Sequence, residues 1–262
     1  MEKIVIIIPT YNEKENITSM IEVLENDIFS KIKDFNMFIL VIDDNSPDGT
    51  ADKVNNLKKK YDNLQITCGQ RKGLGMAYRR GIIYAVKKMD ADVVIKMDAD
   101  FQHNPIYVFN LLEKYRQGYK YVIGSRFTPG GSVPKEWNIY RKILSKYGGL
   151  CARTILFFPD IKTIKSISDI SSGFALASVR DVLKRLDLSK LSSGFYYSPQ
   201  LIFQIANIGI EIAEVPIIFE IRGKGETKMP FSNIPATLYA MITLRLFGKR
   251  KFKNNKKTNE LL

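Results

Sequence analysis

Strand-like apolar runs alternate with segments of helical spacing four times in about the first hundred residues, and this order constrains the fold more than any other feature. The runs cover residues 4–8, 37–42, 64–68 and 93–97. The segments with helical spacing cover residues 15–24, 50–60, 76–89 and 106–117. The alternation predicts right-handed βαβ crossovers and therefore an α/β fold, with helices flanking a mostly parallel sheet.

The rest of the chain predicts shorter and less regular elements. We expect strands at residues 119–124, 173–177 and 210–219, and helices at residues 137–158, 179–186 and 199–207. Pro216 interrupts the last strand and cannot donate a ladder hydrogen bond, which predicts an edge or a bulge. With no internal repeat or linker, residues 1–229 are predicted to form one domain and residues 230–262 a C-terminal appendage.

Polar residues gather directly after three of the predicted strands. Thr10 to Glu13 follow the first strand, Asp43 and Asp44 the second, and Asp98 and Asp100 the fourth. Ligands of parallel α/β sheets bind beyond the carboxyl ends of the strands. The three clusters therefore predict a shared ligand crevice at that edge of the sheet.

Asp98 and Asp100 form a candidate metal site. They lie one residue apart, so in extended backbone both side chains point to the same side. Taken alone, such a pair is more often two solvated carboxylates that cap the helix after Pro105. In a crevice, however, two carboxylates this close repel each other unless a cation neutralises them. Oxygen ligands that leave positions open for phosphate oxygens suit Mg²⁺ or Mn²⁺.

The chain is basic, with 40 lysines and arginines against 27 acidic residues and a net charge of +13. This excess suits a nucleic acid, an anionic membrane surface or phosphorylated ligands. Residues 234–247 predict an amphipathic helix, and a cluster of lysines and arginines without acids follows up to residue 257. Such a helix either lies on an anionic cytoplasmic leaflet or packs on the core and leaves a solvated tail.

Several other classes of protein are disfavoured. Two cysteines, Cys68 and Cys151, support neither a disulfide framework nor a zinc site, and they favour a reducing cytosol. We expect no signal peptide and no membrane-spanning helix, which would need about 18 apolar residues in a row. His103, the only histidine, is expected to form a hydrogen bond beside the carboxylate pair or to begin a helix.

Six motifs occur in a fixed order along the chain and carry a resemblance. They are VIIIPTYNE (5–13), VIDDNSPDGT (41–50), RKGLG (71–75), DADFQH (98–103), GSRF (124–127) and EVPI (214–217). Over about residues 4–228 the chain resembles the dolichol-phosphate mannose synthases, polyprenyl-phosphate mannosyltransferases of glycosyltransferase family 2. The resemblance implies a GT-A, Rossmann-like catalytic domain. It also implies inverting transfer of mannose from GDP-mannose to the phosphate of a dolichol or other polyprenyl lipid, with Mg²⁺ or Mn²⁺.

The resemblance also implies roles at the donor. The nucleobase and ribose would be framed by Pro9, Tyr11 and Glu13, and Asp43 would accept hydrogen bonds from guanosine. The metal would be held by Asp98, Asp100 and Gln102. The full set of expected donor-binding residues is Pro9, Tyr11, Glu13, Asp43, Lys72, Asp98, Ala99, Asp100, Gln102, Asp169, Arg222 and Lys228.

The site for the acceptor phosphate is expected to need cationic side chains that bind it rather than a general base that activates it. A phosphate monoester is already anionic near neutral pH and can attack without a strong general base. Arg126, Arg141 and Ser145 match the family's contacts to this phosphate. Arg222 and Lys228 match a basic loop that closes on the diphosphate. The residues expected to carry the reaction are Asp100, Arg126, Arg141, Ser145 and Arg222.

Without the resemblance, several of these residues have simpler interpretations. Gln102 would be a surface amide, Lys72 and Arg141 solvated cations, and residues 222–228 an exposed basic hairpin. Asp169 is about equally well explained as a cap of a helix or turn.

The chain also departs from the family. Ala175 stands where members commonly carry arginine, and Tyr197 to Leu201 lack the glutamate of a family helix motif. Both departures fall in the half that shapes the sugar and acceptor sites. A polyprenyl-phosphate glucosyltransferase that uses UDP-glucose, or another sugar nucleotide, is therefore the nearest alternative.

The alternative from another class is a basic nucleotide- or nucleic-acid-binding protein without catalysis. Such a protein would interleave aromatic and basic residues on one face, whereas the polar clusters here follow strand ends, so no nucleic acid is expected. The resemblance places the protein peripherally at the cytoplasmic face of the membrane. A small membrane subunit is a further partner that it allows.

Overall fold

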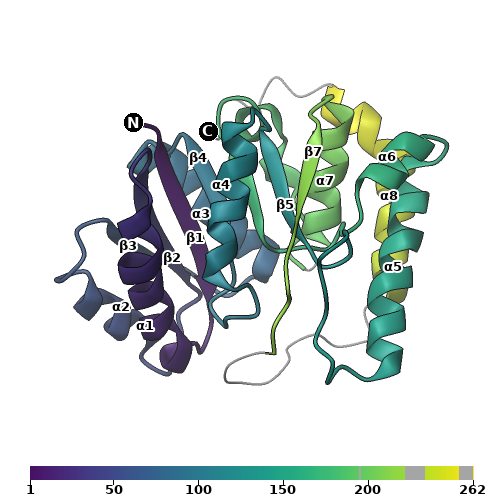
Figure 1. The fold of residues 1–262 in the computed structure, drawn as a ribbon. Coiled ribbons are helices and arrows are strands. Elements are labelled where there is room, and N and C mark those ends of the chain that lie inside the picture. Colours follow the sequence, from purple (N-terminus) through teal and green to yellow (C-terminus); the bar gives the residue numbers. More distant parts are fainter. Residues whose placement is uncertain (195, 222–233, 254–261) are drawn as a thin grey trace.

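A computed structural model gives the structure of the chain and describes residues 1–194, 196–221, 234–253 and 262. In the last helix, side chains are described from residue 237 to residue 248. Figure 1 shows one sheet with helices on both of its faces. Within the described residues the sheet has seven strands, which are β1 (Lys3–Thr10), β2 (Asn36–Asp43), β3 (Leu64–Cys68), β4 (Val93–Lys96), β5 (Tyr121–Ser125), β6 (Ala175–Ser178) and β7 (Ile212–Pro216).

The strand order across the sheet is β3-β2-β1-β4-β6-β5-β7. Strands β1, β2, β3 and β4 run parallel to one another, as do β5 and β7. Strand β6 is antiparallel to both of its neighbours, β4 and β5. The predicted α/β fold with a mostly parallel sheet is therefore confirmed.

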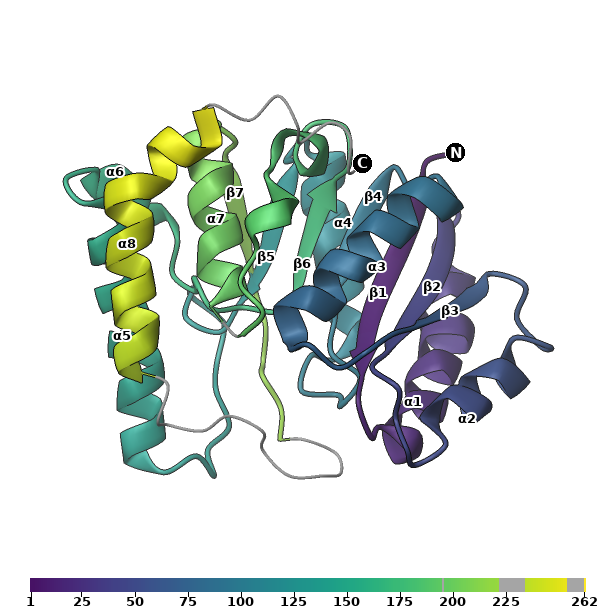
Figure 2. The same cartoon turned by 180° about the vertical axis from the view of Figure 1, so that it is seen from behind.

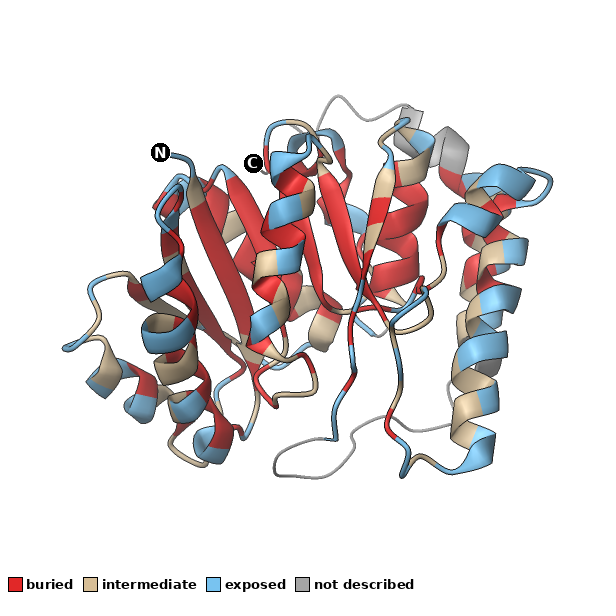
Figure 3. Cartoon of the chain, viewed as in Figure 1, coloured by how far each residue is buried: buried red, intermediate tan, exposed pale blue. Residues whose placement is uncertain are grey.

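Strand β1 shows why the sheet is apolar throughout. Ile4 to Ile8 are fully buried, and successive side chains alternate between two cores. Val5 and Ile7 belong to one core, whereas the isoleucines on either side of them belong to the other. A strand buried on both faces needs a continuous apolar run, which residues 4–8 provide. Figure 3 shows the resulting band of buried residues through the middle of the molecule.

Helices cover both faces of the sheet. Helices α1 (Lys14–Val23), α2 (Thr50–Leu57) and α4 (Val108–Arg116) contribute buried side chains to one core. The core on the other face is built with α3 (Leu74–Met89), α5 (Ile139–Phe157), α6 (Ile161–Ser166), α7 (Tyr197–Asn207) and α8 (Ile234–Lys253), and Figure 2 shows these helices from behind. Short helical turns occur at Leu24–Ile28, Phe29–Lys31, Pro105–Tyr107, Leu183–Arg185 and Leu188–Lys190.

Two local predictions can be compared directly with the structure. Strand β7, which ends at Pro216, lies at the edge of the sheet, as predicted. The predicted helix over residues 179–186 is wrong, because this segment forms turns and one short helical turn. Ser178 Oγ accepts from the backbone N–H of Asp181 and donates to its carboxylate, which is the pattern of a helix N-cap, but the chain continues as turns rather than as an α-helix.

The C-terminal helix α8 packs against α5 and α7. Its residues Met241 and Leu244 are buried in the core. Other apolar residues of α8 are exposed, namely Leu238, Tyr239, Ile242, Leu246 and Phe247. The division of the chain after residue 229 and the membrane role of α8 stay predictions. No helix in the described part of the chain has the length and hydrophobicity to cross a bilayer.

Candidate active site

The carboxyl ends of β1, β2 and β4 lie side by side at one edge of the sheet, at the bottom of Figure 1. Thr10 pairs with Asp43 at the ends of β1 and β2, and Thr10 Oγ1 donates a 2.9 Å hydrogen bond to Asp43 Oδ1. Lys96 ends the pairing of β4 with β1, and Asp98 and Asp100 follow at the same edge. The three polar clusters therefore converge.

The turns at this edge share an unusual backbone conformation. Asn12 after β1, Asn45 after β2 and Phe101 after β4 have φ angles of 56°, 53° and 62°. Asparagine tolerates this left-handed region, whereas a bulky residue such as phenylalanine adopts it at a cost of about 1–3 kcal/mol. Asp90 is the only other non-glycine residue with positive φ in the described part of the chain. A strained residue such as Phe101, next to the carboxylate pair, is typical of a functional site.

The two candidate metal ligands are held by different contacts. Asp100 is 3% exposed, and its Oδ1 accepts a 3.1 Å hydrogen bond from the backbone N–H of Gln102. The side chain of Asp98 is 32% exposed. Its Oδ1 accepts a 2.9 Å hydrogen bond from the Tyr78 hydroxyl, and its Oδ2 lies 3.5 Å from His103 Nδ1.

His103 is buried beside this pair rather than exposed to substrate. Its ring stacks on Phe174 at a centroid distance of 5.4 Å and meets the Phe219 ring edge-on at 5.2 Å. Burial lowers the pKa of His103 to about 4, so the imidazole is neutral near pH 7. A neutral, packed imidazole orients its neighbours and is not suited to accept a proton at that pH.

The pair fits a hard divalent cation only with further oxygen ligands. Among the described residues, no three His, Cys, Asp or Glu side chains lie close enough to hold a metal. Mg²⁺ is commonly bound by one or two carboxylates together with substrate phosphates, and the partly exposed Asp98 with Asp100 suits that arrangement. Gln102 donates from Nε2 to the Glu220 carbonyl at 3.4 Å, which leaves Oε1 as its candidate ligand atom. Its metal role stays a prediction.

On the nucleotide side, the predicted residues are held by neighbours. The Arg71 guanidinium lies 3.9 Å from the centroid of the Tyr11 ring. Glu13 is buried and accepts a 2.8 Å hydrogen bond from Asn16 Nδ2, while Pro9 lies within β1. No sequence pattern pairs Arg71 with Tyr11, because the two residues approach each other only through the packing of the sheet.

Asp43 is fixed by its own turn. It is 1% exposed, and its carboxylate accepts hydrogen bonds from Ser46 N at 2.8 Å and Ser46 Oγ at 2.6 Å. The neighbouring Asp44 pairs with Arg80 at 2.6 Å. A carboxylate held this firmly is well placed to recognise a nucleoside, and that role stays a prediction.

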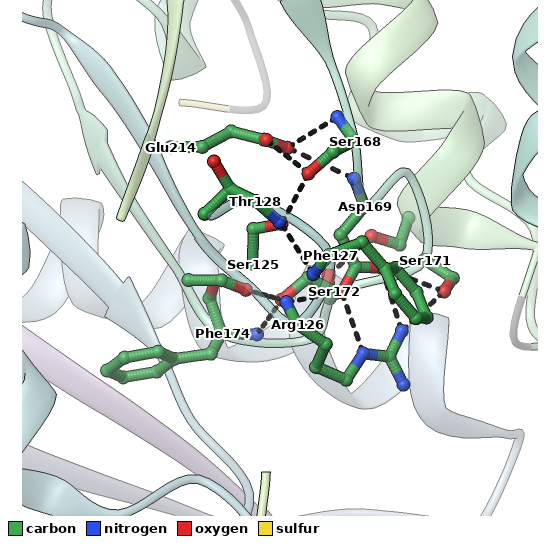
Figure 4. A network of polar contacts seen from close by, with 12 residues as sticks. Ser125, Arg126, Phe127, Thr128, Ser168, Asp169, Ser171, Ser172, Phe174 and Glu214 are labelled. Carbon is green, nitrogen blue, oxygen red and sulfur yellow. Dashed lines mark hydrogen bonds and ion pairs between the residues drawn. The ribbon is translucent and has the colours of Figure 1, made fainter. Parts of the chain in front are cut away.

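Arg126 and Asp169 form a buried ion pair at the end of β5, shown in Figure 4. Arg126 Nε and Nη2 donate to the two oxygens of Asp169, both at 2.7 Å, and the backbone N–H of Arg126 donates to the same carboxylate. Burial opposes ionisation of Asp169, but the Arg126 charge and these hydrogen bonds hold its pKa below the usual value. Asp169 is therefore the counter-ion of Arg126. Its proposed contact to the sugar stays a prediction.

Glu214 on β7 fixes the segment that carries Asp169. Glu214 Oε1 accepts from the backbone N–H groups of Ser168 and Asp169 at 2.9 and 3.1 Å. Ser168 Oγ donates to Glu214 Oε2 at 2.5 Å and lies 2.6 Å from Ser125 Oγ (Figure 4). The EVPI motif thus has a structural function that its sequence alone does not reveal.

Arg141 lies in the first turn of α5, whose N-cap Asn138 accepts a hydrogen bond from the Arg141 backbone at 2.8 Å. Its guanidinium lies 3.8 Å from the centroid of the Trp137 ring. Burial and the nearby Arg126 charge lower the pKa of Arg141. Ser145 follows one helical turn later on the same side of α5. The Arg126 guanidinium lies over the ring of Phe219, which meets the Trp137 ring edge-on, so both arginines lie around one pair of contacting rings.

The remaining predicted residues are placed as follows. Lys72 is exposed in the loop before α3, and Ala99 is buried between the two aspartates. Arg222 and Lys228 lie outside the described residues, so their roles stay predictions.

Two buried residues next to the carboxylate pair were not predicted. Tyr78 lies on the buried side of α3, and helical spacing marks it only as a core residue. Lys96 is 4% exposed, and its Nζ has no hydrogen-bond partner among the described residues. It lies 5.0 Å from the Tyr197 ring centroid, and burial lowers its pKa to about 8. A lysine at the end of an otherwise apolar strand is the sequence signal that could have identified Lys96.

Comparison with solved structures supports the fold. The chain superposes on mannosyl-3-phosphoglycerate synthase from Rubrobacter xylanophilus with a TM-score of 0.67, over 95% of this chain and 76% of that one, at 16% identity. Glucosyl-3-phosphoglycerate synthase from Mycobacterium tuberculosis, in complex with Mn²⁺ and UDP-glucose, gives a TM-score of 0.62 over 93% and 79% of the chains, at 18% identity. These identities carry a likeness of fold alone, and the expected GT-A fold is confirmed.

Comparison with sequences identifies the family. The chain is 36% identical over 227 residues to a dolichol-phosphate mannosyltransferase from Pyrococcus furiosus, which covers 87% of this chain and 59% of that protein. It is 33% identical over 251 residues to a polyprenol monophosphomannose synthase from Mycolicibacterium smegmatis, over 95% and 89% of the two chains. The chain thus spans less than two thirds of the Pyrococcus protein but most of the Mycolicibacterium one. The family model described as Glycosyl transferase family 2 matches residues 5–183, and the chain belongs to this family.

Proposed function

We propose that this glycosyltransferase moves mannose from GDP-mannose to the phosphate of a dolichol or other polyprenyl lipid, with inversion at the anomeric carbon. The mannosyl group and the lipid phosphate are supported by the names of relatives, which include an undecaprenyl-phosphate mannosyltransferase from Micrococcus luteus at 34% identity. The guanosine moiety is supported by the match of the strand-end motifs to the dolichol-phosphate mannose synthases.

The observation that best supports the proposal is that the two arginines share a single counter-ion among the described residues. Arg126 is balanced by Asp169, whereas Arg141 forms no ion pair with a carboxylate in the described part of the chain. The two guanidiniums are close enough that the Arg126 charge lowers the pKa of Arg141. Two adjacent guanidiniums with one counter-ion leave a net positive charge, which a phosphate monoester would neutralise through bidentate hydrogen bonds.

The donor would lie over the ends of β1, β2 and β4. Asp43, held by Thr10 and Ser46, would accept hydrogen bonds from the nucleoside. Mg²⁺ or Mn²⁺ bound by Asp98 and Asp100, with Gln102 as a third candidate, would neutralise charge on the leaving diphosphate. The lipid phosphate is already anionic and would attack the anomeric carbon without a general base. The neutral His103 is consistent with such a base-free reaction.

We also propose that the protein works at the cytoplasmic surface of the membrane. Helices α5 and α8 pack against each other, and both expose large apolar side chains. On α5 these are Ile139, Tyr140, Ile143, Tyr147 and Leu150. Apolar residues on two neighbouring helices are typical of an interfacial surface, and a lipid acceptor presents its phosphate at such a surface.

The function can be tested by separating acceptor use from donor use. We expect GDP-mannose with Mn²⁺ to raise the melting temperature more than UDP-glucose or UDP-GlcNAc does. Arg141→Ala should lower transfer to a polyprenyl monophosphate by about 10- to 100-fold, because a charge-assisted contact is lost, while slow hydrolysis of the donor persists. The control is Lys142→Ala, which removes the neighbouring cation of α5.

Two outcomes would overturn the proposal. Equal losses of transfer and donor hydrolysis in Arg141→Ala would remove the acceptor assignment. A larger thermal shift with UDP-glucose, followed by glucose transfer to the lipid phosphate, would replace mannose by glucose.

A further inference from the structure

The two arginines assigned to the acceptor phosphate each lie over an aromatic ring, Arg141 over Trp137 and Arg126 over Phe219. The guanidinium carbon of Arg141 lies 3.8 Å from the Trp137 ring centroid. That of Arg126 lies 5.2 Å from the Phe219 ring centroid. The two rings meet edge to face, with centroids 5.8 Å apart and planes at 75°. We refer to Trp137 and Phe219 as the aromatic platform.

The aromatic platform stabilises two arginines whose positive charges repel each other. Arg126 and Arg141 repel each other, and Asp169 balances only Arg126. The face of an aromatic ring carries negative charge density and attracts a cation within about 6 Å of its centroid, with indole the strongest of the natural rings. The indole face therefore stabilises the Arg141 guanidinium without neutralising it, so that its charge stays available to an incoming anion.

The platform is held on both sides. Trp137 directly precedes the N-cap residue of α5 and lies four residues before Arg141, a spacing that brings the two side chains together. Phe219 is fixed by a backbone hydrogen bond of 2.9 Å to Ser132 and by a bridge to His103, whose ring it contacts. A continuous series of ring contacts thus connects Arg141 to His103, which lies beside the carboxylate pair.

We propose that Trp137 is a positioning residue for the acceptor, whose indole face holds the Arg141 guanidinium beside Arg126 in the orientation that receives a phosphate monoester. This inference rests on the proposed function, in which Arg141 binds the lipid phosphate. Trp137 acts through Arg141 and makes no contact with the phosphate itself.

The sequence supplies a direct reporter of this arrangement. Trp137 is the only tryptophan in the chain, so the intrinsic tryptophan emission comes from the platform alone. A phosphate that pairs with Arg141 changes the net charge next to the indole ring, to which tryptophan emission responds. Titrating the wild-type protein with a polyprenyl monophosphate in detergent should therefore change the emission, whereas the matching polyprenol should not. The response should be lost in Arg141→Ala.

Kinetics test the positioning role separately. Trp137→Leu should raise KM for the polyprenyl monophosphate about ten-fold, because the cation–π contact is lost, with KM for the sugar nucleotide within about two-fold of wild type. Trp137→Phe keeps an aromatic face and should restore most of the acceptor affinity. The matched control is Tyr119→Leu, which removes a partly buried ring before β5 that Lys114 approaches at 5.3 Å, and it should leave both KM values unchanged.

The outcomes separate the two hypotheses. If Arg141→Ala keeps full acceptor use and the tryptophan emission does not respond to the phosphate, the acceptor role of Arg141 in the proposed function is wrong, and the positioning role of Trp137 is wrong with it. If Arg141→Ala loses acceptor use but Trp137→Leu does not, only the positioning role is wrong. A loss of donor and acceptor affinity alike in Trp137→Leu, without recovery in Trp137→Phe, would show a purely structural role. Should Trp137→Leu fail to fold, Trp137→Phe decides, because benzene binds a cation more weakly than indole does and KM for the polyprenyl monophosphate should still rise about two- to three-fold with KM for the sugar nucleotide unchanged. Two unchanged KM values in Trp137→Phe would then remove the positioning role.

Discussion

The hydroxyl of Tyr78 donates a 2.9 Å hydrogen bond to Asp98 Oδ1 and so connects the buried side of α3 to the carboxylate pair that follows β4. Tyr78 is itself fixed, because it is fully buried and stacks on Tyr197 with ring centroids 5.2 Å apart. One oxygen of Asp98 is therefore oriented from inside the protein. Removing a neighbour that orients a metal ligand typically lowers metal affinity or activity by about 10- to 100-fold.

Replacing Tyr78 by phenylalanine should weaken the metal site without unfolding the protein. A hydrogen bond to a charged group contributes about 1.5–3 kcal/mol, so we expect the Mn²⁺ concentration for half-maximal transfer to rise about ten-fold or more. Tyr84→Phe removes a hydroxyl from the same helix away from the carboxylates and serves as the control. An unchanged Mn²⁺ dependence in Tyr78→Phe would show that Asp98 needs no orientation by this hydroxyl.

Asp100→Asn should abolish transfer while preserving the fold. The substitution keeps the buried shape of Asp100 but removes a negative charge that the proposed metal site requires. We expect a loss of at least about 100-fold in transfer, and a similar loss when EDTA is added to the wild-type protein. Asp92→Asn, at the opposite end of β4, is the control. Full activity in EDTA would contradict the metal role.

The sequence predicted the fold well because its main signal is local. Continuous apolar runs at residues 4–8 and 37–42 indicate strands buried on both faces, and strand direction then places the polar clusters at one edge. The predicted helix over residues 179–186 is wrong, because this segment forms turns and one short helical turn although Ser178 caps its start as it would cap a helix.

The side-chain contacts inside the site could not be predicted from the sequence, because they join residues that are far apart along the chain. Arg126 meets Asp169 across 43 residues, and Trp137 meets Phe219 across a longer stretch still. Such pairs form only when strands β5 and β7 and the segments after them have packed. The sequence could nominate Arg126 and Asp169 separately, but it could not show that one neutralises the other.

The single histidine gives a pH prediction. Burial lowers the pKa of His103 to about 4 in the folded protein, against 6.5 for an exposed imidazole. The folded state thus favours the neutral form, and this contribution to stability is present above pH 6.5 and is lost as the pH falls toward 4. Between pH 7 and pH 5 it lowers the free energy of unfolding by about 2 kcal/mol.

Proton NMR and urea unfolding can check the value for His103. The one imidazole signal should titrate near pH 4, and His103→Gln should flatten the fall in stability between pH 7 and pH 5. A signal that titrates near pH 6.5 would contradict the burial of this ring against Phe174 and Phe219.

Gly75 is predicted to tolerate no side chain. Its backbone N–H donates to the Ser193 carbonyl at 3.0 Å, and a Cβ at this position would lie 1.9 Å from the Ser192 carbonyl oxygen. Because a backbone atom cannot yield as a flexible side chain does, Gly75→Ala should lower the free energy of unfolding by about 2 kcal/mol. Gly149→Ala, inside α5 with open space around it, should instead stabilise by up to about 1 kcal/mol. Thermal unfolding of both variants measures the contrast, and equal stabilities would contradict the close approach.

The exposed apolar side chains of α5 and α8 should bind a membrane surface. Ile143 on α5 and Leu246 on α8 are 50% and 64% exposed, and both helices lie in one packed pair. Inserting two such side chains into the interface of a bilayer contributes enough that Ile143→Ser with Leu246→Ser should weaken binding to vesicles at least about ten-fold. Co-sedimentation with vesicles of neutral and anionic lipids measures this. Ile106→Ser removes an equally exposed apolar residue before α4 and should bind as wild type does. If the double variant and this control bind alike, the surface of α5 and α8 is not the one that meets the membrane.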